Sequence, residues 1–259
     1  MFPFSFEYGR LSESWCALFA LRSRVRKSAT GSVIVIYVSS FSRWFPSALQ
    51  AQGPFSIVGL CLEWKSLYVE QVVRLPHTRL CMSPPVAAPE PSAPPVLSNG
   101  FITFGCYQTL PKINAGVLAA WAHILAACPQ ARLRLQAPQF SDAGQLSRFG
   151  ERLLAAGIDA ARVDLLPPVS RAQYLDSYSQ VDILLDTFPY PGGTTTAEAL
   201  WMGVPTLTLA MPGMLGRQGQ ALLSSLGLHD WVTHSEAEYM AQAVAWGQGG
   251  GLVAERLQS

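Results

Sequence analysis

The chain has 259 residues, of which 49% are hydrophobic and 14% charged, enough apolar material to bury one or two ordinary cores. Its 18 basic and 17 acidic residues leave a net charge of +1, which provides no excess positive charge for a nucleic-acid partner. The five cysteines form no C-x-x-C pair and have no zinc-spaced histidines, so we expect reduced thiols and a cytoplasmic location. No apolar run approaches the roughly 20 residues of a bilayer span, so no membrane partner is expected.

A proline-rich stretch, Ser83–Ser98, predicts a linker, because proline interrupts both helices and central strands. Residues 1–64 contain strand-like runs without recurring alternation, and no fold is assigned to them. Their basic run Phe19–Ser32 is also compatible with part of a transit peptide, although it lacks the alternation of an amphipathic helix. We therefore divide the chain into an unassigned N-terminal region (1–64), a connecting segment with the linker (65–98) and a regular domain (99–259).

Residues 99–259 alternate short β-rich runs with longer helical patterns, as successive βα units do. The expected strands are Phe101–Gly105, Leu133–Ala137, Val163–Leu166, Val181–Thr187, Pro205–Leu209 and Trp231–Thr233. These strands and about six helices predict an α/β fold, a Rossmann-like doubly wound parallel sheet.

Helix boundaries in this domain are marked by capping residues. Asp142 and Gly157 are expected to flank a helix over Ala143–Ala156. In a capping box, a Ser or Thr at the helix start and a Glu or Gln three positions later each bond the backbone N–H of the other. Three pairs fit this pattern: Ser170 with Gln173, Thr195 with Glu198, and Ser235 with Glu238.

A glycine- and threonine-rich loop follows the fourth expected strand and opens the next helix. It consists of Gly192, Gly193, Thr194, Thr195 and Thr196. Ligands of open α/β sheets bind at the carboxyl ends of the strands, and a helix start offers unpaired N–H groups to phosphate. Glycines let the backbone come close and threonine hydroxyls add donors, so the loop is suited to a diphosphate. The alternative is that the loop only turns the chain and Thr195 and Glu198 cap the helix; for Glu198 capping is the role that we expect.

Two segments together resemble a known family. Asp186–Leu209, with Phe104–Asn114 about 80 residues upstream, is similar to the C-terminal catalytic lobe of the O-GlcNAc transferases and SPINDLY-like proteins, glycosyltransferase family 41. The resemblance extends from about Leu67 to Gln242. It implies that residues 99–259 are the nucleotide-sugar-binding lobe of a GT-B glycosyltransferase. The implied activity is inverting transfer of GlcNAc from UDP-GlcNAc to Ser or Thr of a protein or peptide acceptor.

The resemblance also implies roles for single residues. Lys112 matches the family's phosphate-binding lysine and is the candidate catalytic residue, while Thr194 and Thr195 match its threonine pair. Gly193 stands where a histidine often precedes that pair.

Two further matches concern the nucleoside. Glu198 matches the acidic residue that binds the ribose, and Tyr174 replaces a histidine near the base. The aromatic ring of Tyr174 can still stack, so this replacement affects nucleotide preference more than binding. We predict that Tyr174 packs near the base at the same sheet edge as the threonine loop.

Sugar transfer from a nucleotide requires the charge of a departing diphosphate to be met by a metal or by fixed donors. The chain contains no D-x-D pair, so neither a metal nor a cofactor is expected. Lys112, beside Gln108, the threonines and Arg217 are the candidate donors, although Lys112 also fits a surface lysine and Arg217 a helix-end charge. We predict that Lys112 and the threonine loop form one diphosphate clamp.

Family members carry another lobe before this one, with catalytic histidines, and residues 1–64 do not match it. His77 lies in the resembling segment, and a structural role is expected for it. The chain is therefore expected to be a truncated or misread member, or a domain whose opening residues come from elsewhere. Alternatives are a non-catalytic nucleotide-sugar-binding module and a protein O-fucosyltransferase that uses GDP-fucose. A dehydrogenase-like domain is disfavoured, because the first turn has one glycine where the dinucleotide fingerprint needs three.

Overall fold

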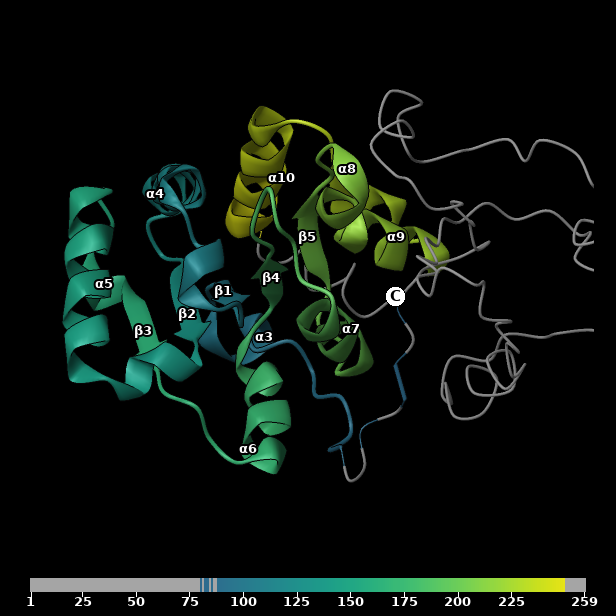
Figure 1. Ribbon diagram of the computed structural model, residues 1–259, viewed down its shortest axis with the longest axis horizontal. Helices are drawn as coiled ribbons and strands as arrows, with labels where there is room; N and C mark the ends of the chain where they lie inside the picture. The colour runs from purple at the N-terminus through teal and green to yellow at the C-terminus, as the bar shows by residue number, and fades with distance from the viewer. Residues whose placement is uncertain (1–79, 81, 84, 86–87, 250–259) are drawn as a thin grey trace, which may run out of the picture.

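The computed structural model describes residues 80, 82–83, 85 and 88–249 of the chain (Figure 1). The region 1–64, most of the connecting segment 65–98, His77 and residues 250–259 lie outside the described residues. The described part includes every β-rich and helical segment on which the fold prediction depends.

Six strands form one sheet in the order β3-β2-β1-β4-β5-β6, and every neighbouring pair is parallel. The strands are β1 (Thr103–Cys106), β2 (Arg132–Gln136), β3 (Val163–Leu166), β4 (Ile183–Leu185), β5 (Thr206–Leu209) and β6 (Val232–Thr233). The chain winds outward from β1 to β3, returns to the other side of β1, and then winds outward to β6. The predicted Rossmann-like doubly wound sheet is therefore confirmed.

The direction of winding reverses between β1 and β4, which are neighbours in the sheet although two strands separate them in the sequence. Open α/β sheets bind ligands in the crevice at such a reversal, because the loops that follow the two strands diverge to opposite faces. The loop after β1 holds Lys112, and the loop after β4 leads into the threonines at the start of α7.

Strand β4 is shorter than the expected run Val181–Thr187, and a buried aspartate lies directly beyond each of its ends. Asp182 accepts hydrogen bonds from the N–H groups of Val96 and Thr103, each at 2.8 Å. Asp186 accepts hydrogen bonds from the backbone N–H groups of Thr187 and Gly192, which follow it in the chain. Strand β1 likewise begins at Thr103 instead of Phe101.

Helices cover both faces of the sheet. They are α3 (Val96–Asn99), α4 (Ala115–Ala127), α5 (Ala143–Ala155), α6 (Arg171–Asp176), α7 (Thr194–Trp201), α8 (Gly213–Gly216), α9 (Gln218–Ser225) and α10 (Glu236–Gln248). Short 3-10 turns are η2 (Leu110–Lys112), η3 (Pro138–Ser141), η4 (Ala160–Arg162), η5 (Ser177–Gln180) and η6 (His229–Trp231). In Figure 1, α4 and α10 lie above the strands, and α6 and α7 lie below them.

Each face has its own apolar core. Trp121 of α4, Phe149 of α5 and Tyr239 of α10 belong to one cluster, which includes the strand residues Phe104 and Leu133. A smaller cluster on the other face joins α6, η5 and α7. Within the described ranges, no helix combines the length and the apolar character needed to cross a bilayer.

Two of the three expected capping pairs act at helix starts. Ser170 and Gln173 bond each other's backbone N–H groups at the start of α6. The Ser235 hydroxyl accepts from Glu238 N–H, while the Glu238 carboxylate accepts from the N–H of His234 instead of Ser235. Asp142 caps α5 as expected.

The capping prediction for Thr195 and Glu198 is wrong. Helix α7 begins two residues earlier than a Thr195 cap implies, at Thr194, with Gly193 as its cap and no side-chain capping bond. Glu198 is buried and bonds side chains of α6 instead. The Glu198 carboxylate thus bonds partners on another helix, although its spacing from Thr195 predicted a bond to the backbone.

The predicted linker ends in ordered structure. Its last residues contribute the single helical turn α3, and Val96 belongs to the main apolar core. The N–H of Val96 bonds Asp182, which joins this turn to the centre of the sheet. The described fold therefore extends a few residues before the expected boundary at 99.

Candidate functional site

The candidate site consists of two loops at the carboxyl ends of β1 and β4. The first runs from Tyr107 through η2 to Asn114, the cap of α4. The second runs from Asp186 to Gly193 and leads directly into α7. Asn114 joins the two, because its amide donates a 2.6 Å hydrogen bond to the carbonyl of Phe188 while its oxygen caps α4.

Lys112 and the threonine loop are in contact through Gln108. The Lys112 ammonium donates to the Gln108 side-chain oxygen at 2.9 Å and to the Pro191 carbonyl at 3.2 Å. The Gln108 amide donates in turn to the Thr195 hydroxyl at 2.5 Å. The predicted meeting of these two distant segments at one sheet edge is thus observed.

The surroundings of Lys112 hold its ammonium group in place. Nζ lies 4.1 Å from the ring centroid of Tyr190, a cation–π distance, and Tyr190 belongs to the loop after β4. Burial lowers the pKa of Lys112, and the nearby Asp186 carboxylate acts against this shift. A second anion beside the ammonium would favour its charged form further, so a phosphate suits this position.

Gly192 and Gly193 are required for close packing. A Cβ at Gly192 would collide with the Gln108 amide and with the hydroxyls of Thr195 and Thr196. A Cβ at Gly193 would collide with the amide of Gln218. Both glycines therefore let side chains from other elements approach the backbone, and their close approach to a phosphate stays a prediction.

The loop also depends on Asp186, a residue that the sequence reasoning missed. Its carboxylate is 3% exposed and accepts from the N–H groups of Gly192 at 2.7 Å and Thr187 at 2.9 Å and from the Thr208 hydroxyl at 3.0 Å. Burial raises the pKa of Asp186 to about 6, although these hydrogen bonds and Lys112 lower it. Its position directly after a buried strand was the sequence signal that could have identified Asp186 as a site residue.

Tyr174 lies beside the threonine helix, on the same sheet edge as predicted. Its hydroxyl donates to Glu198 and lies 3.0 Å from the hydroxyl of Tyr178, while Tyr107 meets its ring edge-on. Burial raises the pKa of Tyr174 above its ordinary range. Its contact with a nucleotide base stays a prediction.

Arg171 is a second residue that the sequence reasoning missed. Its guanidinium forms a 2.7 Å ion pair with Glu198 and lies 5.4 Å from the ring centroid of Tyr174. The hydrogen bond with Glu198 raises the pKa of Arg171. Glu198 thus has a partner on each of its oxygens, and both partners come from α6.

Arg217 lies at the junction of α8 and α9, half-buried and directly before Gln218, whose amide packs against Gly193. The chain therefore brings Arg217 near the loop, and its contact with phosphate stays a prediction. Among the described residues, no three His, Cys, Asp or Glu side chains gather as metal ligands would.

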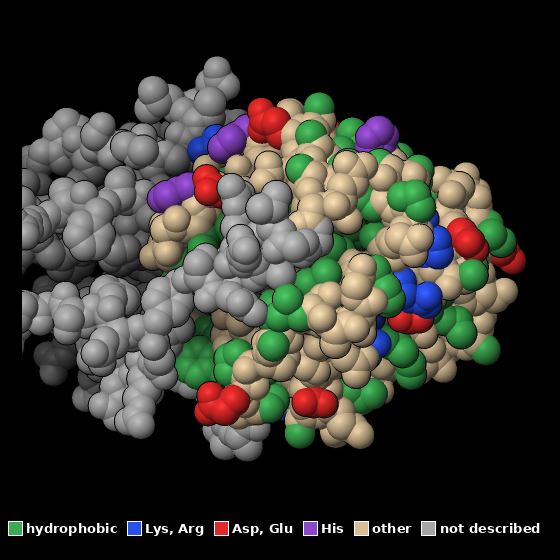
Figure 2. All heavy atoms as spheres, turned by 180° about the vertical axis from the view of Figure 1, so that it is seen from behind, with side chains coloured by type: hydrophobic (Ala, Val, Ile, Leu, Met, Phe, Trp, Pro, Cys, Tyr) green, Lys and Arg blue, Asp and Glu red, His purple; other side chains and the backbone are tan. Residues whose placement is uncertain are grey.

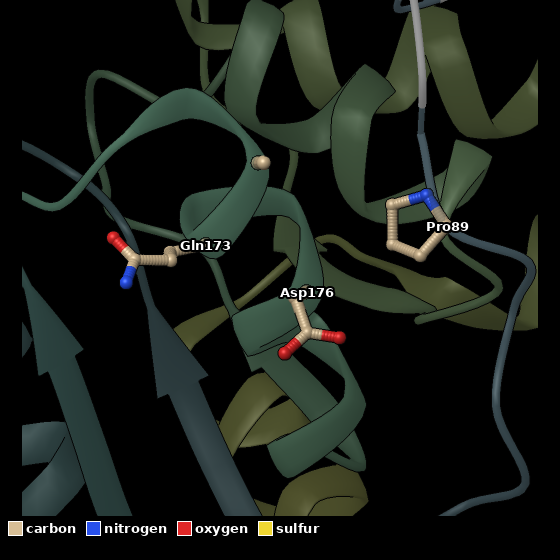
Figure 3. Close-up of a pocket in the computed structure, with 4 residues that line it drawn as sticks. Pro89, Gln173 and Asp176 are labelled. Atoms are coloured by element: carbon tan, nitrogen blue, oxygen red, sulfur yellow. The ribbon is translucent and has the colours of Figure 1, made fainter.

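A shallow surface hollow of about 310 Å³ lies away from the two loops, between α6 and the segment at Pro89. Figure 3 shows that its labelled side chains do not converge on one point: Gln173 and Asp176 extend in different directions from the helix. Gln173 is also engaged in capping α6. We therefore place the candidate site at the two loops and not at this hollow.

The parallel sheet, its winding reversal and the two loops define a Rossmann-like α/β domain of the kind that forms one lobe of GT-B glycosyltransferases. The sequence profile of glycosyl transferase family 41 matches residues 95–255. The chain belongs to glycosyltransferase family 41.

Named relatives agree with this assignment. The chain is 41% identical over 181 residues to the SPINDLY protein of Solanum lycopersicum, a match that covers 70% of this chain and 19% of the relative. The SPINDLY protein of Oryza sativa subsp. japonica is 44% identical over 179 residues, which cover 68% of this chain and 19% of that protein. Both carry the name "Probable UDP-N-acetylglucosamine–peptide N-acetylglucosaminyltransferase SPINDLY". The chain spans about a fifth of the length of these relatives.

A solved O-GlcNAc transferase from Thermobaculum terrenum has the same fold, with a TM-score of 0.68 and 39% sequence identity. The match covers 74% of this chain and 37% of that protein. The expected resemblance and the GT-B fold class are thereby confirmed.

Proposed function

We propose that the described domain binds the nucleotide sugar in a protein O-GlcNAc transferase, which moves GlcNAc from UDP-GlcNAc to Ser or Thr hydroxyls of proteins. The observation that carries this proposal is the contact from Lys112 through Gln108 to Thr195 at the winding reversal of the sheet. It brings a cation, an amide and a helix start to one place, as a diphosphate requires.

In this reaction the bond between the sugar's anomeric carbon and the diphosphate breaks as the acceptor hydroxyl oxygen attacks from the opposite side. The hydroxyl proton leaves to a base, and negative charge grows on the departing UDP. Lys112 places a positive charge there, and Thr194, Thr195 and Thr196 add hydroxyls and the unpaired N–H groups of the first turn of α7. Each charge-assisted hydrogen bond contributes about 1.5 to 3 kcal/mol.

The nucleoside end of the donor belongs beside Tyr174 and Glu198 in this proposal. Both lie on the α6 side of Thr195, since the Tyr178 hydroxyl that contacts Tyr174 also donates to the Thr195 carbonyl at 3.3 Å. Glu198 would bind the ribose and Tyr174 the base, while Arg217 approaches the phosphates from the α9 side. The pyrophosphate would then lie between these groups and Lys112.

Acceptor binding is proposed for the complete family member, of which this chain covers about a fifth. On the face that Figure 2 shows, basic side chains of the described residues lie next to acidic ones. Together with the net charge of +1, this supports a function without nucleic acid. A cytoplasmic location is proposed on the free, buried thiols of Cys106 and Cys128.

Calorimetry with UDP, UDP-GlcNAc, GDP-fucose and uridine tests this proposal. We expect UDP and UDP-GlcNAc to bind and uridine to bind much more weakly, because uridine lacks the diphosphate. Tighter binding of GDP-fucose than of UDP-GlcNAc would replace the proposed donor with that of a protein O-fucosyltransferase. Absence of binding to every nucleotide would refute the proposed site.

A further inference from the structure

Asp186 fixes the loop that the proposed diphosphate site uses. One carboxylate oxygen accepts the N–H of Gly192 at 2.7 Å, two residues before α7 begins. The other accepts the Thr208 hydroxyl of β5 at 3.0 Å. The Asp186 carboxylate therefore links Gly192, in the loop before α7, to strand β5 of the sheet.

The space around the carboxylate is closed from the α9 side as well. A Cβ at Gly219 of α9 would collide with the Thr208 hydroxyl and lie 3.0 Å from the second oxygen of Asp186. The Tyr239 hydroxyl of α10 donates to the Asp186 carbonyl at 3.0 Å, which fixes the backbone at the same residue. Elements from both faces of the sheet thus fix where Asp186 lies.

We propose that Asp186 is a positioning residue for the nucleotide's diphosphate: its charged carboxylate holds Gly192, and through it the start of α7, in the form that receives phosphate. This role rests on the nucleotide-binding function proposed above. Asp186 itself lies behind the loop, and it acts through the Gly192 N–H group and not by touching the ligand.

The charge on Asp186 matters because a carboxylate accepts hydrogen bonds more strongly than a neutral carboxyl. Three titratable groups face it: Lys112 from η2, Cys106 from the end of β1 and Tyr239 from α10. Of these, Lys112 favours the charged carboxylate. With a pKa raised to about 6 by burial, Asp186 is charged above that pH and becomes neutral below it. UDP affinity should therefore fall as pH falls through about 6.

The change in stability when the charge of Asp186 is removed distinguishes a positioning role from a purely structural one. The folded-state pKa is raised, so the charged form is disfavoured in the folded protein, and stability is lost as pH rises from the ordinary carboxyl pKa of 3.8 through about 6. Asp186→Asn removes that charge while keeping the shape. We expect this variant to keep or raise the melting temperature at pH 7.5 and yet to bind UDP about tenfold more weakly.

Asp182 provides a matched control at the other end of β4. It is 1% exposed and accepts two backbone N–H groups, but at the amino edge of the sheet, away from the loops. Asp182→Asn should leave UDP affinity within about twofold of the parent. The experiment is calorimetric titration of UDP into the full chain and both variants between pH 5 and 8. The second ionisation of the UDP phosphate, near pH 6, affects all three alike and cancels in the ratio of affinities.

We expect the parent to bind UDP about ten times more tightly than Asp186→Asn at pH 7.5, and this ratio of affinities to approach one at pH 5. A ratio that stays constant with pH, or equal binding by both proteins at pH 7.5, would overturn the role of Asp186 alone. Failure of the parent to bind any nucleotide would overturn the proposed function with it. Thr208→Val tests the same role if Asp186→Asn does not fold. The Thr208 hydroxyl lowers the pKa of Asp186, so its loss should move the midpoint of the pH dependence of UDP affinity upward from that of the parent. An unmoved midpoint would contradict the role.

Discussion

The diphosphate clamp makes a sharp prediction for two variants, Lys112→Ala and Thr195→Val. Lys112→Ala removes the ammonium that now bonds Gln108 and Pro191, and Thr195→Val removes the hydroxyl that receives the Gln108 amide. In the proposed clamp, each variant lacks one donor to phosphate. We expect UDP affinity to fall while uridine affinity stays within about twofold of the parent, because uridine has no phosphate.

The size of the loss follows from the bonds involved. A charge-assisted hydrogen bond contributes about 1.5 to 3 kcal/mol, so Lys112→Ala should weaken UDP binding by about 10- to 150-fold. Thr195→Val should weaken it by about tenfold, since a neutral donor contributes less. The valine also leaves the buried Gln108 amide without its hydroxyl partner, which should lower the free energy of unfolding by about 1 to 3 kcal/mol.

Calorimetry with UDP and uridine measures both effects at fixed ionic strength. Arg148→Ala, an exposed position on α5, is the control for the loss of one positive charge, and it should change neither affinity. The reasoning would be refuted if both site variants bound UDP as the parent does. Equal losses for UDP and uridine would show that the variants disturb the whole site instead of the phosphate contacts.

Further predictions concern the loop, the base and the reaction. Gly192→Ala should weaken UDP binding more than tenfold, because its Cβ would push the Gln108 amide and two threonine hydroxyls apart; calorimetry beside Gly150→Ala, at a glycine with open space around it, checks this. Tyr174→Ala should weaken UDP binding by the stacking contribution of about 1 to 3 kcal/mol, and Tyr174→Phe should keep that stacking, so equal losses for both contradict base stacking. The chain of residues 1–259 should bind UDP-GlcNAc but transfer sugar to a peptide poorly or not at all, and rapid peptide glycosylation in a radiolabel assay would contradict this.

The sequence allowed the sheet and the meeting of Lys112 with the threonine loop to be predicted, because both follow from topology. Parallel strands joined by right-handed crossovers bring all loops that follow them to one edge, whatever the separation in sequence. Two loops about 80 residues apart could thus be placed together before any contact was known. Strand β3 has the bounds that the sequence predicted, Val163–Leu166.

What could not be predicted depends on side chains that meet across elements. Thr195 and Glu198 have the spacing of a cap, yet Arg171 and Tyr174 of α6 take the Glu198 carboxylate. Asp186 bonds the nearby Thr187 and Gly192 as a turn residue can, and its link to the sheet depends on Thr208, 22 positions away. Local spacing reports the bonds that a residue is able to form, and the packing of distant helices decides which of them form.

The bond between Asp182 and Val96 determines where this domain can be cut for laboratory production. A fragment that begins at residue 99 or 100 would lack the Val96 N–H group, and the carboxylate at the amino end of β4 would lose one of its two hydrogen bonds while still buried. It would also lack the Val96 side chain, which fills part of the main core. Trimming should therefore stop upstream of Pro94 and Pro95, whose carbonyls accept the N–H groups of the α3 turn.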